Sequence, residues 1–399
     1  MNVFFIGCFY PEIRENQIRQ DSKISLDYAA NNFQSALIAG LDHYYANLKL
    51  ITQPNIGAYP STYKKLFFKQ TVFSHNGKSN DYCLGFVNIP YFKLISKKNS
   101  LLKHLKKQLV PSADTTLIIY NLHSPFLKAA MELKKTRKNL KICLVVPDLP
   151  QFMSENNNPI YLFLKRIDKN LLNKYLEYVD SFVLLNESMV HELKVKNRPW
   201  VLIEGIYKSE NEIKIQVKKE VYKTILYTGN IDERYGIKTL VDAFGLIKNP
   251  NYRLWIRGSG SSLSYVKNAA MNDSRIIYFD QMSKDELIAL QKKATILINP
   301  VSSSQEFTKC FFPSKTMDYM ASCTPTLMTR LQGVPNEYYN YVYTIEDEDA
   351  NGIKNAILDV CNKEVEELNL FGEKAANFIF ENKNHLIQVK KIYEMLKKI

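Results

Sequence analysis

Short runs of hydrophobic residues alternate with longer amphipathic stretches along almost the whole chain. Short apolar runs bounded by turn residues are typical of buried strands in a parallel sheet, and the stretches between them have the periodicity of helices that cover such a sheet. This alternation predicts an α/β fold. We expect strands at residues 3–7, 48–53, 83–89, 116–120, 141–146, 181–185 and 201–204, and then at 224–228, 252–257, 275–279, 295–299, 326–328 and 342–344.

The clearest helix of the first half lies between its first two strands. Its apolar residues fall on one stripe at helical spacing: Leu26, Ala29, Ala30, Phe33, Leu37, Gly40 and Leu41. At the other end of the chain, the last thirty-odd residues are predicted to form two helices that are broken near residues 382–383, with no strand after them. We expect the closing helix to pack back on the first half.

A polar and charged stretch at residues 210–223 interrupts the alternation, which then starts again. The chain has 399 residues, and a single hydrophobic core rarely grows to that size. We therefore predict two α/β domains, at residues 1–208 and 209–380. Residues 381–399 would form the helix that returns to the first domain.

The charge of the chain is unevenly distributed. There are 53 basic and 40 acidic residues, a net charge of +13, which indicates an anionic partner. Residues 93–107 contain six lysines, no acid and several leucines at partly helical spacing. Together with a basic and aromatic cluster at residues 63–69, this favours peripheral contact with acidic lipid headgroups. A solvated basic helix is the alternative, and no nucleic-acid recognition motif is present, so we expect no nucleic-acid partner.

No hydrophobic run approaches the roughly 20 residues needed to span a membrane. The first residues lack a basic region before their apolar run and have the length of a buried strand, unlike a signal segment. The six cysteines are scattered, without the paired spacing of a zinc or redox site. We expect a cytoplasmic protein that can lie on the inner face of the cell membrane.

Ligands of open parallel sheets bind outside the carboxyl ends of the strands. After the strand at 224–228, Gly229 would let a ligand approach the backbone, Asn230 follows it, and Arg234 could reach a phosphate. Gly258 begins a second tight turn after the strand at 252–257. Ordinary glycine turns, with Arg234 on the surface, are the alternative.

The most informative segment is residues 311–325. Pro313 suits the first turn of a helix, Ser314 could cap it, and Lys315 adds a cation to its amino end, so this helix would attract a phosphate. Asp318 would place a carboxylate one turn further along. In the preceding loop, Glu306 is the only acid between Glu286 and Asp318 and could meet a sugar. A capped helix with an internal ion pair is the alternative.

Two residues of the first half follow strands and could act in acid–base chemistry, His123 and Asp148. Capping or turn formation would explain either of them equally well. The acidic run at 347–349 has the form of a metal-binding motif, but it precedes a helix expected to begin near Ala350, where acids favour the helix dipole. We therefore predict no metal site there.

Segments 227–244, 256–260 and 312–325, in this order, resemble the nucleotide-sugar glycosyltransferases of family 4. That family is retaining and metal-independent, and it includes many bacterial capsule, O-antigen and exopolysaccharide enzymes. Its members are built from two Rossmann-like domains facing across a cleft, so the resemblance implies this architecture for the two domains predicted above. The first half matches it more loosely, at residues 31–34 and 147–150.

The resemblance implies roles for individual residues. Asp318 matches the family's second motif acid, which typically binds the ribose, although glutamate is usual there. The first motif acid lies eight positions earlier, where this chain has Cys310, so Glu306 can take that role only if the loop is four residues longer. Asn230 and Tyr235 occupy the positions of the family's basic pair, and Arg234 precedes the second of them.

These features predict transfer of a sugar from a nucleoside-diphosphate donor, with UDP as the favoured nucleotide. The acceptor would be a hydroxyl of a growing glycan, which could be carried on a polyprenyl diphosphate. Gly229, Asn230, Arg234, Gly258, Ser314, Lys315 and Asp318 would bind the donor, and Glu306, Asp148 and His123 would act in catalysis, without a metal or another cofactor. A nucleotide-sugar epimerase of the same fold and an inactive scaffold subunit remain alternatives.

Overall fold

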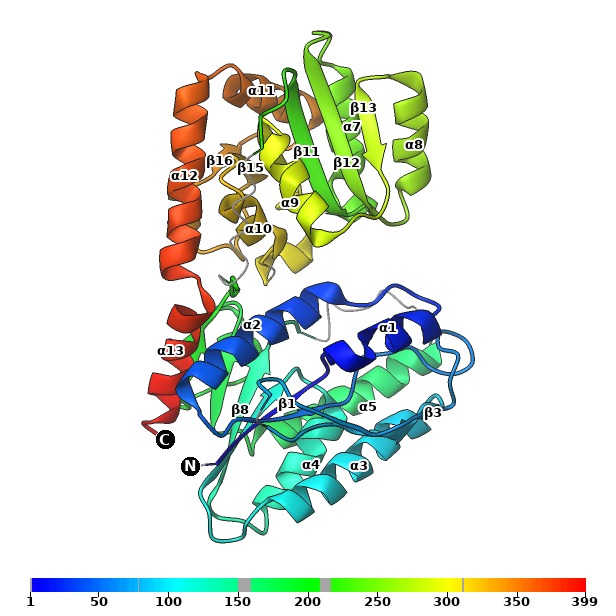
Figure 1. Cartoon of the computed structure of the whole chain (residues 1–399), viewed down its shortest axis with the longest axis vertical. Helices are drawn as coiled ribbons and strands as arrows, with labels where there is room; N and C mark the ends of the chain where they lie inside the picture. Colours follow the sequence, from blue (N-terminus) through cyan, green and yellow to red (C-terminus); the bar gives the residue numbers. More distant parts are fainter. Residues whose placement is uncertain (1, 78, 150–158, 209–216, 311) are drawn as a thin grey trace. The chain divides into compact units, whose positions relative to one another are not determined.

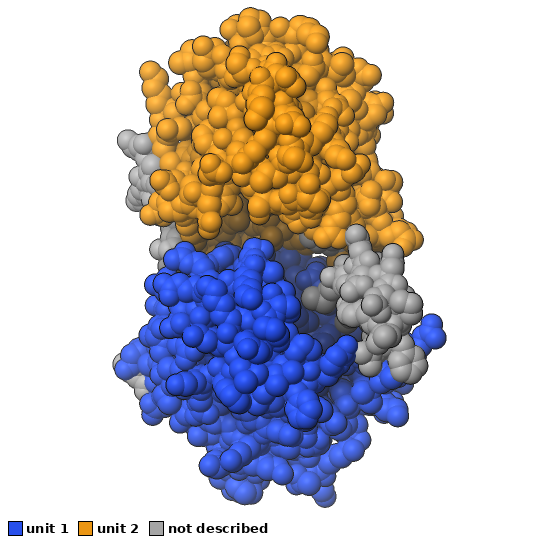
Figure 2. Space-filling view, turned by 90° about the vertical axis from the view of Figure 1, so that its right-hand side faces the viewer, with its two compact units in different colours: residues 1–206, 385–399 blue, residues 207–384 orange. Residues whose placement is uncertain are grey.

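The computed structural model describes residues 2–77, 79–149, 159–208, 217–310 and 312–399, which divide into two compact units (Figure 2). Unit 1 comprises residues 1–206 and 385–399, and unit 2 comprises residues 207–384. The polar stretch that suggests a boundary after residue 208 lies partly outside the described residues, as does Phe311 at the start of the informative segment.

Unit 1 has a sheet covered by helices (Figure 1). Its elements are β1 (Asn2–Gly7), α1 (Glu12–Asp21), α2 (Tyr28–Tyr44), β2 (Lys49–Thr52), β3 (Phe67–Phe68), β4 (Thr71–Phe73), β5 (Asp81–Cys83), β6 (Phe86–Val87), α3 (Phe92–Gln108), β7 (Thr115–Tyr120), α4 (Ser124–Lys134), β8 (Leu140–Val146), α5 (Pro159–Leu176), β9 (Ser181–Leu184), α6 (Met189–Glu192), β10 (Trp200–Leu202) and α13 (His385–Leu396). The strand order is β10-β9-β8-β7-β1-β2-β5-β4, parallel except for β4.

The strand predicted at residues 83–89 is wrong. The chain leaves the main sheet after Cys83, and Phe86–Val87 pairs instead with β3 in a separate antiparallel ribbon. Gly85 lies at the crossing, where a side chain would come within 2.9 Å of the Phe68 carbonyl oxygen. The apolar pattern of residues 83–89 cannot reveal this change of pairing partner, because apolar residues are buried in the main sheet and in the ribbon alike.

The closing helix α13 belongs to unit 1, as predicted for the last residues of the chain. Its Val389 and Ile392 are fully buried in the same core as Leu37 and Leu41 of α2. Gly40 makes this contact possible, because a Cβ there would lie 2.4 Å from Cγ2 of Val389. The break before α13 therefore returns the chain to the core of unit 1.

The basic segment at residues 93–107 forms α3, but its lysines do not all face solvent as expected. Lys97 is 2% exposed, and its ammonium donates to the carbonyl oxygens of Gln53 and Pro54, both at 3.1 Å. Lys93 donates to the carbonyl oxygen of Ile56. Desolvation lowers the pKa of Lys97 to about 7. These two lysines donate hydrogen bonds to backbone carbonyl oxygens of the loop after β2, so they are unavailable to a partner surface.

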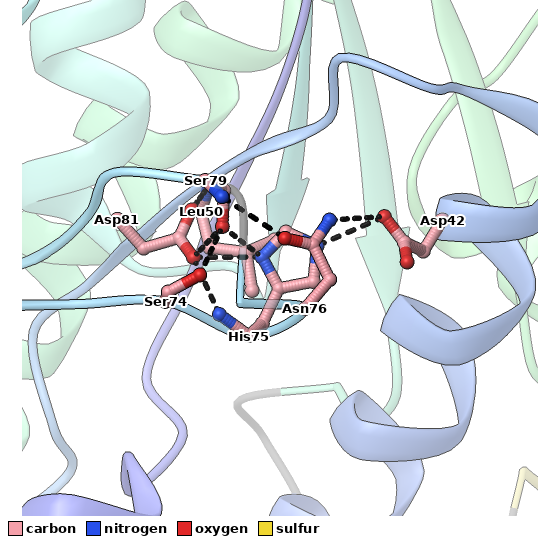
Figure 3. Close-up of polar contacts among 7 residues, drawn as sticks. All are labelled: Asp42, Leu50, Ser74, His75, Asn76, Ser79 and Asp81. Carbon is pink, nitrogen blue, oxygen red and sulfur yellow. Dashed lines mark hydrogen bonds and ion pairs between the residues drawn. The ribbon is translucent and has the colours of Figure 1, made fainter.

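A polar network in unit 1 links α2 to the loop between β4 and β5 (Figure 3). The imidazole of His75 lies between two carboxylates, 2.7 Å from Asp81 and 2.9 Å from Asp42. Asp81 is fully buried and also accepts bonds from the Leu50 N–H and the Ser79 hydroxyl. Burial alone would lower the pKa of His75, but the two carboxylates outweigh it and raise that pKa.

Unit 2 is also a helix-covered sheet. Its elements are β11 (Lys223–Asn230), η3 (Glu233–Tyr235), α7 (Ile237–Gly245), β12 (Tyr252–Ser259), α8 (Leu263–Asn272), β13 (Ile276–Phe279), α9 (Lys284–Lys293), β14 (Ile296–Asn299), η4 (Glu306–Lys309), α10 (Lys315–Ala321), β15 (Thr326–Thr329), η5 (Asn336–Asn340), β16 (Tyr343–Ile345), α11 (Ala350–Cys361) and α12 (Val365–Asn382). The strands are parallel, in the order β13-β12-β11-β14-β15-β16, so their carboxyl ends share one edge.

Candidate functional site

Two glycines form a bare stretch of backbone at the carboxyl edge of the second sheet. Gly229 of β11 pairs with Gly258 of β12, and both have positive φ angles, 132° and 155°. A Cβ on Gly258 would lie 1.8 Å from the carbonyl oxygen of Gly229, so no side chain fits there. The two strand ends therefore approach each other closely and leave their backbone open to a ligand.

Lys315 lies directly beside this backbone. A Cβ built on Gly229 would be 3.6 Å from the Lys315 ammonium nitrogen, which stands 4.0 Å from the centre of the Tyr227 ring. In the described part of the chain no carboxylate pairs with Lys315, and desolvation lowers its pKa to about 7. A half-buried cation without a counter-ion, placed against exposed backbone, is suited to bind an anion.

The helix that carries Lys315 starts differently from our prediction. Ser314 has helical backbone angles (φ −52°, ψ −34°) and forms no capping hydrogen bond, so it is not the predicted cap. Helix α10 is only seven residues long. The attraction for an anion in this segment therefore rests on the Lys315 ammonium more than on a capped helix end.

A buried tyrosine fixes α10 to β11. The Tyr319 hydroxyl accepts from the Thr228 N–H at 2.8 Å and donates to the Thr228 carbonyl oxygen at 3.1 Å. The pairing between β11 and β14 ends at Leu226, so this hydroxyl takes the place of a strand partner beyond that residue. The hydrogen bonds between Tyr319 and Thr228, the residue before Gly229, therefore hold Lys315 close to Gly229. The sequence reasoning missed Tyr319, although it directly follows Asp318.

Asp318 lies on the same short helix, with an exposed side chain. Desolvation raises its pKa above the ordinary value and the charge of Lys284 opposes this. An ion pair between Lys315 and Asp318, which is the alternative to an anion site, is absent from the described residues, so the carboxylate is free to meet a ligand hydroxyl.

Glu306 and Arg234 come from two loops that meet through aromatic rings. Glu306 is exposed at the start of η4, and the next residue, Phe307, packs against Tyr235 with 5.8 Å between ring centres. The Arg234 guanidinium lies 5.1 Å from the Tyr235 ring and 5.7 Å from the Phe307 ring. Asn230 is exposed at the end of β11, next to these loops in sequence.

The loop that carries Glu306 is anchored by an acid from the run at 347–349. Glu348 accepts from the Ser302 hydroxyl and, at 2.9 Å, from the Ser303 N–H. Asp349 caps α11 by accepting from the Gly352 N–H, which confirms that this run precedes a helix at Ala350. Cys310 is half-buried at the end of η4. Glu348 is a supporting residue that the sequence reasoning did not identify.

In unit 1, His123 and Asp148 follow the neighbouring strands β7 and β8. Burial, with the charges of Lys97 and Lys93, lowers the pKa of His123 well below 6.5, so its imidazole is neutral. Desolvation and then the charge of Asp27 raise the pKa of Asp148. Asp27, the cap of α2, is therefore a further acid at this edge that the sequence reasoning missed. Among the described residues, no hydrogen bond joins His123 to Asp148.

The edge of unit 2 that holds Lys315 belongs to a segment of the chain that matches a known protein family. Residues 208–378 match the family model described as "Glycosyl transferases group 1", and this range covers nearly all of unit 2. The chain is a glycosyltransferase. No match was found among curated protein sequences.

Solved structures show that the fold of this glycosyltransferase extends over its whole length. Sucrose-phosphate synthase from Thermosynechococcus elongatus superposes with a TM-score of 0.68 at 14% identity, covering 100% of both chains. Anabaena Alr3699/HepE in complex with UDP gives 0.66 at 11% identity, also over 100% of both. An α,α-trehalose-phosphate synthase (UDP-forming) from Burkholderia xenovorans gives 0.64 at 10%, over 99% of this chain and 100% of the other. At such identities the similarity establishes the fold, two Rossmann-like domains of the GT-B type.

Proposed function

We propose that this glycosyltransferase moves a sugar from a nucleoside-diphosphate donor to a hydroxyl of a growing surface glycan, with retention of the anomeric configuration. UDP is the donor nucleotide that we favour. The observation that carries the proposal is the unpaired Lys315 ammonium against the bare backbone of Gly229. The UDP complex of the Anabaena protein, which shares the fold, supports the choice of nucleotide. The motifs around Lys315 and Gly229 support placement in family 4.

The diphosphate leaving group gains negative charge as the glycosidic bond breaks. Lys315 would offset that charge at the strand ends, and Arg234 would reach it from η3 with a planar guanidinium. With a pKa of about 7 in the free protein, Lys315 would become fully protonated when a diphosphate binds, since a nearby anion raises that pKa. We propose that these cations act without a metal.

The remaining acids of unit 2 would act on the two sugars of the donor. Asp318, exposed on α10, would accept hydrogen bonds from the ribose hydroxyls. Glu306, held in place through Glu348 and Phe307, would orient the transferred sugar and stabilise positive charge at its reacting carbon. Both roles need a carboxylate that no protein cation neutralises, and no ion pair of either acid is found among the described residues.

Unit 1 would bind the acceptor. His123 is neutral and could accept a proton, and burial raises the pKa of Asp148 above that of an ordinary aspartate. A glycan carried on a polyprenyl diphosphate is the acceptor we favour, because unit 1 also offers a surface suited to acidic lipids.

That surface has exposed apolar side chains at the start of α3 and exposed lysines, Lys103, Lys106 and Lys107, toward the end of the same helix. At the start of α3, Tyr91, Phe92 and Ile95 are 71%, 65% and 56% exposed. Between Asp42 and Asp114 the sequence contains a single acid, the buried Asp81. No described helix has the length and hydrophobicity to cross a bilayer, so the contact we propose is peripheral.

Cosedimentation with vesicles tests this contact. Adding an acid at Phe92 (Phe92→Asp) should reduce binding to vesicles that contain acidic lipid. The control Ile13→Asp changes an equally exposed apolar residue of α1 and should bind as the parent does. Equal binding of parent and Phe92→Asp would refute the membrane surface and leave sugar transfer untouched.

Donor binding is tested with Lys315→Ala. Removing the ammonium should weaken UDP binding and slow release of nucleotide from UDP-sugars by at least tenfold. Lys248→Ala, which removes an exposed lysine bonded only to the Gly245 carbonyl oxygen, is the matched control. Full donor affinity and turnover in Lys315→Ala would refute the assignment. Product formed without any acceptor would indicate an epimerase, and no turnover with any donor or membrane extract would indicate a scaffold.

A further inference from the structure

Arg257 stands in the last row of side chains at the carboxyl edge of unit 2. Strand pairing sets Thr228 of β11 beside Arg257 of β12, and Arg257 beside Phe279 of β13. Paired residues of parallel strands point to the same face of a sheet. The Thr228 hydroxyl bonds to Tyr319, so this row faces α10, the helix that carries Lys315 and Asp318.

Arg257 has no partner within the described chain. It forms no hydrogen bond, ion pair or ring contact there, and its Nε–H is buried without an acceptor. Arg253, on the same face of the same strand, is fully engaged. It donates to the carbonyl oxygens of Pro250 and Tyr252, and its guanidinium stacks on the Tyr222 ring at 3.7 Å. The same residue type is therefore satisfied at the amino end of β12 and unsatisfied at its carboxyl end.

A buried N–H without an acceptor is unfavourable, and a ligand that supplies an acceptor would remove this cost. The half-buried position of Arg257 leaves it reachable from the edge where Lys315 and Asp318 lie. Lys315 is beside β11, at Gly229, whereas Arg257 is one strand further along the sheet. The half-buried ring of Phe279 comes next in the row and packs against Trp255 at 5.4 Å. A planar guanidinium beside an aromatic side chain is suited to bind a flat ligand ring that carries carbonyl groups.

We propose that Arg257 binds the base of the donor nucleotide and selects a base with a ring carbonyl, uracil or guanine, over adenine. This inference rests on the proposed use of a nucleoside-diphosphate donor. The guanidinium only donates hydrogen bonds, so it pairs with carbonyl oxygens and meets an unfavourable contact at the amino group of adenine. Arg257 is in this account a specificity-determining residue.

Calorimetric titration of UDP, GDP and ADP tests the proposal. The parent should bind UDP or GDP more tightly than ADP. Arg257→Ala should weaken the preferred nucleotide roughly tenfold and leave ADP within about twofold, so that the preference is lost. Arg257→Lys should also lose it, because an ammonium lacks the planar fork. Arg253→Ala should keep the parent's preference.

Three results would overturn the inference: a parent that prefers ADP, an Arg257→Ala variant with the parent's preference, or one that weakens all three nucleotides equally. The last result would assign Arg257 to the phosphates or to stability, and melting temperatures of the variants would separate these two. A parent that binds none of the three nucleotides would instead refute the proposed function itself.

Discussion

Replacing Tyr319 by phenylalanine removes one oxygen atom from the connection between α10 and β11. Tyr319 is fully buried and Thr228 is 5% exposed. In the variant, water cannot readily replace the hydroxyl that bonds to both the N–H and the carbonyl oxygen of Thr228. The phenyl ring keeps the packing with Leu226 and Leu297, so the change isolates the hydrogen bonds.

The size of the effect follows from those two backbone groups. A buried polar group that loses its partner costs about 1–3 kcal/mol. We expect Tyr319→Phe to lower the free energy of unfolding of unit 2 by about 2 kcal/mol. In a domain of about 180 residues, this corresponds to a melting temperature lower by roughly 4–8 °C. UDP affinity should fall as well, because Lys315 and Gly229 are no longer held at a fixed separation.

Scanning calorimetry with and without UDP measures both effects. Tyr265→Phe is the control, since its hydroxyl bonds to Asp242 at an exposed site and its loss should cost less than about 0.5 kcal/mol. If Tyr319→Phe melts within a degree of the parent, the bonds to Thr228 do not stabilise this edge. If it melts lower but binds UDP with unchanged affinity, Tyr319 contributes to folding alone.

Three further predictions concern other parts of the molecule. His75 has a pKa raised above 6.5, so its stabilisation is complete below pH 6.5 and is lost as the pH rises through the folded-state pKa. The difference in melting temperature between the parent and His75→Gln should therefore shrink from pH 6 to pH 9, and a constant difference would contradict an imidazolium. The pKa of Lys97 is lowered to about 7, so its protonation destabilises unit 1 most below pH 7 and no longer does so above pH 10.5. The melting temperature of Lys97→Met relative to the parent should rise as the pH falls from about 10 to 7, and the opposite slope would count against a buried, titrating lysine. Finally, Gly258→Ala should abolish measurable UDP binding because its Cβ would overlap the Gly229 carbonyl oxygen, whereas Gly245→Ala, with no atom within 4 Å, should bind UDP normally. Normal binding by Gly258→Ala would refute the close approach of the two strands.

Much of the fold could be predicted from the sequence because its evidence is local. Each parallel strand is a short apolar run and each covering helix an apolar stripe, so the strands of unit 2 lie within a few residues of their predicted bounds. The break before α13 could also be read from the pattern. The residues around Lys315 stood out for the same reason, since a cation and an acid beside turn residues can be recognised without knowing their neighbours.

Long-range contacts decided the rest. Which sheet receives Phe86 depends on a backbone approach at Gly85, and which lysines of α3 face inward depends on carbonyl groups after β2. The pairing of His75 with Asp42 and Asp81 joins residues up to 33 positions apart.

The sequence by itself determined the class of fold, the order of its elements and the segment that holds Lys315 and Asp318. Only the tertiary structure showed that Ser314 does not cap α10, that Tyr319 holds this helix to β11, and that Arg257 has no partner among the described residues. The physical reason is that periodicity within a segment fixes its secondary structure, whereas the partners of a polar side chain depend on which segments strand pairing and packing bring beside it.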